Sequence, residues 1–144
     1  MRYWDASGIV PLLVRQARSQ AMATLLKQDP GILTWWGTPV ECLSAITRLA
    51  RENRLDPSQA REAENRLQEL RQSWNEVLPG EACRSMAERM LRVHPLRAAD
   101  ALQLAAAVIA ADHDPTRLPM VCLDRRLMDA AVREGFFPAA SLDA

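Results

Sequence analysis

The chain has 144 residues, enough for one domain with its own hydrophobic core. Hydrophobic residues make up 49% and charged residues 25%, the balance of an ordinary globular protein. The 18 Lys and Arg residues equal the 18 Asp and Glu residues, which excludes the strongly basic profile of a non-specific nucleic-acid coat protein. A local basic rim stays compatible with this balance. We expect a single domain over residues 1–144.

Cysteine usage and hydropathy indicate the compartment. The three cysteines lie far apart and form no CxxC pair, which favours buried thiols over a disulfide framework. The opening segment reaches Asp5 before an apolar run could form, unlike a secretory signal. The most apolar stretch, 101–111, is far shorter than the roughly 20 residues of a membrane span. We therefore expect a cytoplasmic protein that does not insert into a membrane.

The first part of the chain alternates short apolar strands with helices. The predicted elements are a strand at Met1–Trp4, helices at Ile9–Arg15 and Ser19–Gln28, and a strand at Ile32–Trp36. Thr38 then predicts a helix start, with Pro39 at the first helical position and Glu41 three residues after the cap. This helix is expected to run to about Asn53.

The second part repeats the alternation. A similar start at Asp56 predicts a polar helix to Arg71, and the later elements are a weak strand at Trp74–Leu78, helices at Glu81–Val93 and Arg97–Ala111, a strand at Pro119–Leu123, a helix at Asp124–Glu134 and an edge strand at Phe136–Phe137. The helix at 97–111 is apolar on nearly every side, so it should be the central one. Short strands separated by helices predict an α/β fold whose parallel sheet carries helices on both faces.

Four acids stand where predicted strands end or the following helices begin. Asp5 and Asp124 end strands, whereas Glu41 and Asp100 lie in first helical turns. Because these positions share one edge of a parallel sheet, we expect the four acids on one side of the domain. Two carboxylates about 4 Å apart repel by roughly 4 kcal/mol. A hard cation, Mg²⁺ or Mn²⁺, is therefore expected among these oxygen ligands.

Simpler roles account for each acid taken alone. Asp5 and Asp124 are both placed to be N-caps. Glu41 is placed to complete a capping box with Thr38. Asp100 is a first-turn acid of the kind a helix dipole stabilises, but it lies among apolar residues where an unpaired charge is costly, so we expect it to be the most buried of the four.

Four segments carry a family resemblance. They are Tyr3-Trp4-Asp5-Ala6-Ser7, Val40-Glu41-Cys42, Leu96-Arg97-Ala98-Ala99-Asp100-Ala101-Leu102-Gln103-Leu104-Ala105, and Val121-Cys122-Leu123-Asp124-Arg125-Arg126-Leu127. Together they resemble PIN-domain proteins, and their order and spacing resemble the VapC-type toxins of bacterial toxin–antitoxin pairs. The resemblance covers essentially the whole chain, and the segment around Asp100 is its most specific part.

The resemblance implies a three-layer α/β/α fold, Mg²⁺- or Mn²⁺-dependent endoribonuclease activity, a homodimer and a small cognate antitoxin as partner. By motif, the metal-binding and catalytic positions are Asp5, Glu41, Asp100 and Asp124. Ser7 matches the hydroxyl that supports the site of the first acid, although a plain turn or cap hydroxyl would look the same. Two positions depart from the pattern: Ala6 replaces a frequent Thr or Ser, and Cys122 stands where a hydroxyl is often found.

Cationic and aromatic residues near the acids have two interpretations each. Arg97, Arg125 and Arg126 could hold RNA phosphates at the rim of the site, or be solvated and paired with nearby acids such as Glu134 and Asp129. The pair at 35–36 could stack bases, although core packing is the simpler role for tryptophans in a predicted strand.

The resulting hypothesis is the toxin of a toxin–antitoxin pair, which cleaves RNA phosphodiesters with metal-activated water. Two alternatives stay open. One is a PIN nuclease that acts on DNA or structured ends without an antitoxin. The other is a non-catalytic PIN-like interaction domain in which the acids are only helix caps.

Overall fold

The computed structural model describes residues 1–142. Within this range the chain forms a four-stranded sheet, seven α-helices and one short 3-10 helix. The strands are β1 (Arg2–Trp4), β2 (Ile32–Trp35), β3 (Asn75–Val77) and β4 (Met120–Val121). The helices are α1 (Ala6–Leu13), α2 (Ser19–Gln28), α3 (Thr38–Arg51), α4 (Pro57–Arg71), α5 (Glu81–Val93), α6 (Ala98–Ala110) and α7 (Arg125–Arg133), with the 3-10 turn at Pro115–Arg117.

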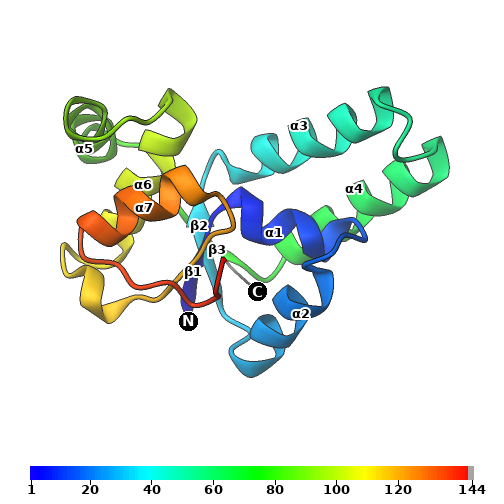
Figure 1. Cartoon of the computed structure of the whole chain (residues 1–144), viewed down its shortest axis with the longest axis horizontal. Helices are drawn as coiled ribbons and strands as arrows, with labels where there is room; N and C mark the ends of the chain where they lie inside the picture. The colour runs from blue at the N-terminus through cyan, green and yellow to red at the C-terminus, as the bar shows by residue number, and fades with distance from the viewer. Residues whose placement is uncertain (143–144) are drawn as a thin grey trace.

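The sheet separates two layers of helices. Helices α1–α4 cover one face and α5–α7 cover the other, with the sheet seen edge-on between them in Figure 1. All strand pairs are parallel and the order is β3-β2-β1-β4. The chain moves outward from β1 to β2 and β3, then returns to the other side of β1. Right-handed crossovers in these two directions put their helices on opposite faces. The α/β/α prediction is confirmed.

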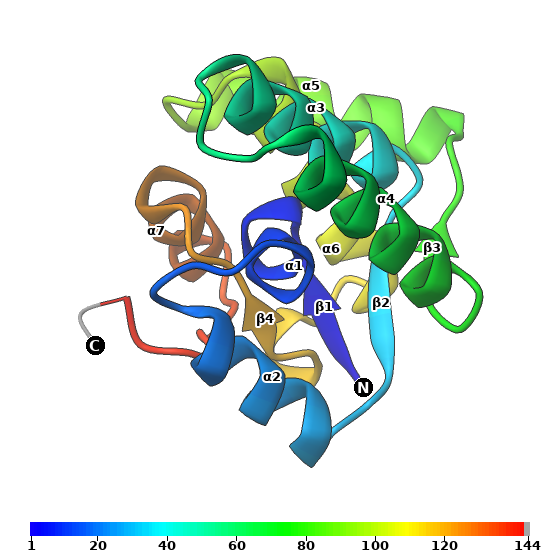
Figure 2. The ribbon, with the colours of Figure 1, turned by 90° about the vertical axis from the view of Figure 1, so that its right-hand side faces the viewer.

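Successive strand residues supply the two halves of the core. Tyr3 and Met120 are fully buried against the α5–α7 layer, whereas Trp4 and Val121 are fully buried against α1–α4. This alternation follows from the pleat of a strand. Figure 2 looks onto the α1–α4 layer, with β1 and β2 running side by side behind it. Helix α6 has more buried residues than any other helix of the described chain, as its composition predicts, because its apolar residues lie between the sheet and α5.

Two predicted helix starts and one predicted strand are wrong. Helix α1 begins at Ala6 rather than at residue 9, because the Asp5 side chain caps it. Helix α3 has Gly37, not Thr38, as its N-cap. The segment 136–137 is no strand: next to β4 the chain makes only an isolated bridge, between Met120 and Pro138.

The polar helix α4 starts as predicted. Asp56 and Gln59 form a full capping box, in which each side chain binds the other residue's backbone N–H. The three cysteines are free and buried, as their apolar neighbours predict. Among residues 1–142, no helix combines the length and the apolar character that crossing a bilayer requires.

Candidate active site

The strand order reverses at β1, and a pocket lies at the carboxyl ends of the strands there. The backbone N–H of Asp5 donates to Val121 O at 3.2 Å, which joins the ends of β1 and β4. A crevice at such a reversal point is where open α/β sheets bind ligands. The pocket measures about 460 Å³ and is lined by Asp5, Ala6, Ser7, Val40, Glu41, Ser44, Arg48, Asp100, Gln103 and Asp124. All four predicted acids line it.

Asp5 is the most buried of the four acids. Its side chain is the N-cap of α1 and accepts hydrogen bonds from Ser7 N at 3.2 Å and Ser7 Oγ at 2.7 Å. Asp5 is only 5% exposed, and this burial, with the nearby charge of Asp124, raises its pKa to about 6 against the effect of the Ser7 hydrogen bonds. The prediction that Asp100 is the most buried acid is wrong. Asp100 is half-buried, because the first turn of α6 opens onto the pocket.

Glu41 is held by a neighbouring helix rather than by a capping box. Gln103 Nε2 of α6 donates to Glu41 Oε2 at 2.5 Å. The Thr38 hydroxyl, which the capping-box interpretation assigned to the start of α3, instead lies 2.9 Å from Gln103 Nε2 and 2.7 Å from Thr34 Oγ1. Burial raises the pKa of Glu41 to about 7, and the charges of Asp5 and Asp100 act in the same direction.

Asp124 and Asp100 are the other two acids that line the pocket. Asp124 is exposed and caps α7, accepting from Leu127 N at 3.0 Å. Partial burial raises the pKa of Asp100, and the charge of Asp124 adds to this, whereas the Arg97 backbone and the guanidinium groups of Arg126 and Arg97 oppose it. The predicted N-cap hydrogen bonds of Asp5 and Asp124 are therefore confirmed. Both acids also line the pocket.

Each of the four carboxylates is repelled electrostatically by two of the others. Asp5 is coupled to Asp124, Asp124 to Asp100, Asp100 to Glu41, and Glu41 to Asp5. Each of these repulsions raises a carboxyl pKa. The negative charge of the acids therefore exceeds the positive charge that the nearby arginines supply. Such a cluster favours either protons or a cation.

The donor chemistry suits a hard cation. The four acids offer carboxylate oxygens alone, the ligands that Mg²⁺ and Mn²⁺ prefer. Burial and the charge of Asp5 raise the pKa of the nearby Cys122 thiol far above its ordinary range, so the protonated thiol is favoured. As the side chains stand, no three His, Cys, Asp or Glu residues in the part of the chain described converge closely enough to hold one ion together.

Among the pocket residues that sequence reasoning missed are Gln103 and Arg48. Gln103 stands in the segment with the most specific family resemblance but was given no role, yet a polar residue inside a buried helix needs a partner. It lies three residues after Asp100, on the same face of α6. Arg48 lies seven residues after Glu41, hence also on one helix face, and its exposed side chain lines the pocket. Helical spacing from the acids is the signal that finds both.

The three predicted arginines divide between two places. Arg97 and Arg126 lie close enough to Asp100 to lower its pKa. Arg125 instead lines a separate pocket between α7 and residues 138–142. The suggested pairing partner Glu134 is engaged elsewhere: its carboxylate lies 3.2 Å from Arg89 Nη1 and 2.7 Å from His94 Nε2.

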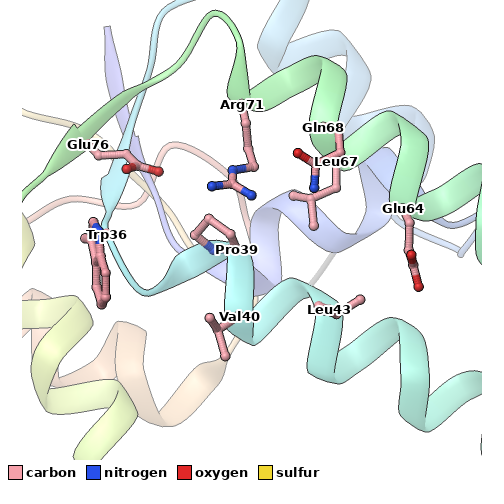
Figure 3. Close-up of a pocket in the computed structure, with 9 residues that line it drawn as sticks. All are labelled: Trp36, Pro39, Val40, Leu43, Glu64, Leu67, Gln68, Arg71 and Glu76. Carbon is pink, nitrogen blue, oxygen red and sulfur yellow. The ribbon is translucent and has the colours of Figure 1, made fainter.

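A groove adjoins the acid pocket across Val40, which lines both. It measures about 260 Å³, and Figure 3 shows α4 side chains such as Arg71 facing Pro39, Val40 and Leu43 of α3, with Trp36 at one end. Trp35 is buried, as core packing predicts, but Trp36 is 53% exposed, so that interpretation is wrong for Trp36. No hydrogen bond or ion pair within residues 1–142 engages the Arg71 guanidinium.

Comparison with models of known protein families finds no match to this chain, and comparison with curated protein sequences finds no significant one.

Proposed function

We propose that this protein is a divalent-metal-dependent endoribonuclease that acts as the toxin of a toxin–antitoxin pair. One observation carries the proposal: four acids from β1, α3, α6 and the β4–α7 junction line a single pocket at the point where the strand order reverses. Their electrostatic coupling and the raised pKa values of three of them support a site that gains by taking up a cation. The resemblance to PIN-domain toxins supplies the class of reaction.

The residues have distinct roles in this proposal. Asp5, Glu41, Asp100 and Asp124 would hold one or two Mg²⁺ or Mn²⁺ ions. When bound, such an ion supplies Lewis-acid chemistry for phosphodiester hydrolysis: it activates water and neutralises charge on the phosphate. Arg48, exposed at the pocket wall, is placed to bind an adjacent phosphate. Arg97 and Arg126 reduce the excess negative charge next to Asp100.

The decisive experiment compares matched acids on a purified protein. Asp100→Asn removes a pocket carboxylate, whereas Asp129→Asn changes an exposed acid of α7 that does not line the pocket. With Mn²⁺, the unmodified protein and Asp129→Asn should cleave single-stranded RNA but not the matched DNA strand, and Asp100→Asn should be inactive while still folded. Full activity of Asp100→Asn would overturn the assignment, and cleavage of DNA would favour the nuclease without an antitoxin.

A second function has its own supporting observation. Asp5 and Asp124 both make ordinary N-cap hydrogen bonds, as they would in a non-catalytic interaction domain. Thermal unfolding with and without Mn²⁺ separates the two, because a cation bound to the folded state must raise the melting temperature. A melting temperature that Mn²⁺ leaves unchanged would favour the interaction domain.

The proposed partners rest on the family resemblance. They are RNA as substrate, a second copy of the chain in a homodimer, and a small antitoxin. Light scattering on the eluting peak of a sizing column tests the homodimer, because it gives the mass of the particle relative to one 16.1 kDa chain. A single-chain mass at micromolar concentration would contradict it.

A further inference from the structure

Glu41 is the end of a buried chain of hydrogen bonds that starts on the central strand. The Tyr3 hydroxyl and Gln103 Oε1 are 2.7 Å apart, and both residues are buried, at 0% and 1% exposure. Gln103 Nε2 then lies 2.9 Å from Thr38 Oγ1 and 2.5 Å from Glu41 Oε2. Within residues 1–142, no hydrogen bond engages the other carboxylate oxygen of Glu41.

Hydrogen counting fixes which end of the Gln103 amide faces Glu41. The carbonyl of Trp4 can only accept, so the Thr34 hydroxyl, 2.6 Å away, must donate to it. Thr34 has then used its one hydrogen, so the Thr38 hydroxyl, 2.7 Å from it, must donate to Thr34. Thr38 in turn can only accept from Gln103, which requires the amide nitrogen on that side.

The contact at the opposite end of the Gln103 amide requires the same orientation. With its nitrogen toward Thr38 and Glu41, the Gln103 carbonyl faces Tyr3 and needs a donor. The Tyr3 phenol has one hydrogen and lies 2.7 Å from that carbonyl oxygen, so it is the donor. A flipped amide would put two acceptor oxygens, Gln103 Oε1 and Glu41 Oε2, against each other and leave Thr38 without its donor.

We propose that Gln103 is a positioning residue of the acid pocket: its amide, locked by Tyr3 and by the Thr38–Thr34–Trp4 chain, holds one oxygen of Glu41 and leaves the other free for a cation. The inference rests on the proposed function and extends it beyond the four acids. Removing a group that orients a metal ligand typically lowers metal affinity or activity 10- to 100-fold. Tyr3 acts on Glu41 indirectly: it binds the Gln103 amide and makes no hydrogen bond with Glu41 itself.

Three substitutions test this role. Gln103→Met keeps the side-chain length but cannot donate, and Tyr3→Phe keeps the ring but removes the hydroxyl that fixes the amide. Gln20→Met makes the same chemical change as Gln103→Met at an exposed position of α2. Calorimetric titration should show Mn²⁺ binding about 10- to 100-fold weaker for Gln103→Met, weakened to a lesser degree for Tyr3→Phe, and unchanged for Gln20→Met.

A double-mutant cycle separates positioning from general loss of packing. In a Glu41→Gln background, Gln103→Met should not weaken Mn²⁺ binding further, because Gln103 acts only through Glu41. With RNA as substrate, Gln103→Met should lower kcat more than it raises KM. Proton exchange of the Gln103 side-chain amide, followed by NMR without metal, should be slow in the unmodified protein and faster in Tyr3→Phe.

The two proposals fail differently. If the unmodified protein binds Mn²⁺ and Gln103→Met binds it equally well, or if Gln103→Met costs as much affinity in the Glu41→Gln background, the positioning role is wrong and the nuclease survives. If the unmodified protein binds no Mn²⁺, the proposed function falls and the positioning role falls with it.

Discussion

The Ser7 hydroxyl oxygen accepts the backbone N–H of Asp124 at 3.2 Å. The same oxygen accepts the N–H of Leu123 at 2.8 Å and donates its own hydrogen to Asp5 Oδ1 at 2.7 Å. One side chain therefore joins the acid that follows β1 to the loop that carries the acid before α7. The spacing between two of the four pocket acids depends on this hydroxyl.

Ser7→Ala should weaken the fold and the site together. It leaves the partly buried Leu123 N–H without its acceptor and removes a hydrogen bond from Asp5, at a cost of about 1–3 kcal/mol. Urea unfolding at pH 7.5 measures this loss, and Mn²⁺ titration should show weaker binding. Ser58→Ala, at an exposed position in the first turn of α4, is the control and should change neither. Unaltered Mn²⁺ affinity in Ser7→Ala would remove Ser7 from the site.

Glu41→Gln should stabilise the metal-free protein at alkaline pH. The folded protein raises the pKa of Glu41 from 4.5 to about 7, so folding favours the protonated carboxyl. The penalty is absent below about pH 4, grows as pH rises, and is complete above about pH 7, where it amounts to about 3 kcal/mol. Glu41→Gln removes it while keeping an acceptor for Gln103.

The measurement is the free energy of unfolding from pH 4.5 to 8.5 in a chelator. The difference between Glu41→Gln and the unmodified protein should grow with pH and level off near pH 7. Taking this difference cancels the titration of the groups that the charge of Glu41 does not influence. Adding Mn²⁺ should reverse the order at pH 8. A difference that is constant with pH would show that the Glu41 carboxyl does not titrate as its burial requires.

Mn²⁺ binding should release protons at neutral pH and weaken as the pH falls. Both Asp5, with a pKa raised to about 6, and Glu41, with one raised to about 7, must lose a proton before they ligate a cation. Calorimetry at pH 6 in two buffers of different ionisation enthalpy counts the protons released. The count should fall toward zero by pH 8.5, and a zero count at pH 6 would exclude these acids as ligands.

The sequence predicts the layers and the placement of the acids well because both depend on alternation. Residues such as Tyr3 and Trp4 indicate a strand, and acids placed after strands or in first turns must meet at one sheet edge. The side-chain roles of the acids stay predictions. Their contacts with one another are visible only in three dimensions, since residues 5, 41, 100 and 124 are remote along the chain.

Errors arose where a local rule competed with a tertiary contact. Thr38 has the sequence signature of an N-cap, but its hydroxyl is used by Thr34 and Gln103. Asp100 has the most apolar neighbours, but Asp5 is more buried, because burial at the end of a central strand depends on the sheet rather than on adjacent residues. Gln103 lies within an apolar helix, where its spacing from Asp100 indicates a place in the pocket, but its hydrogen-bond partners are visible only in the structure.

Trp36→Ala should weaken binding of single-stranded RNA without disturbing the fold. The Trp36 side chain is 53% exposed at one end of the groove next to the acid pocket, and its backbone N–H is fixed to Val77 O at 3.0 Å, so the ring is presented from a rigid position. Stacking of one base on an aromatic ring contributes about 1–3 kcal/mol. In the Asp100→Asn background, which prevents cleavage, fluorescence anisotropy should show roughly 5- to 150-fold weaker binding of a labelled oligonucleotide.

Two control variants show whether the loss of RNA affinity comes from the aromatic ring of Trp36. Trp36→Phe keeps a flat aromatic face and should retain much of the affinity, whereas Leu78→Ala removes another exposed apolar side chain, 68% exposed and outside the groove, and should have no effect. If Trp36→Ala binds RNA as well as the parent, the groove does not contact the substrate. If it instead abolishes binding of a copurifying protein while RNA affinity is kept, the groove binds a protein partner.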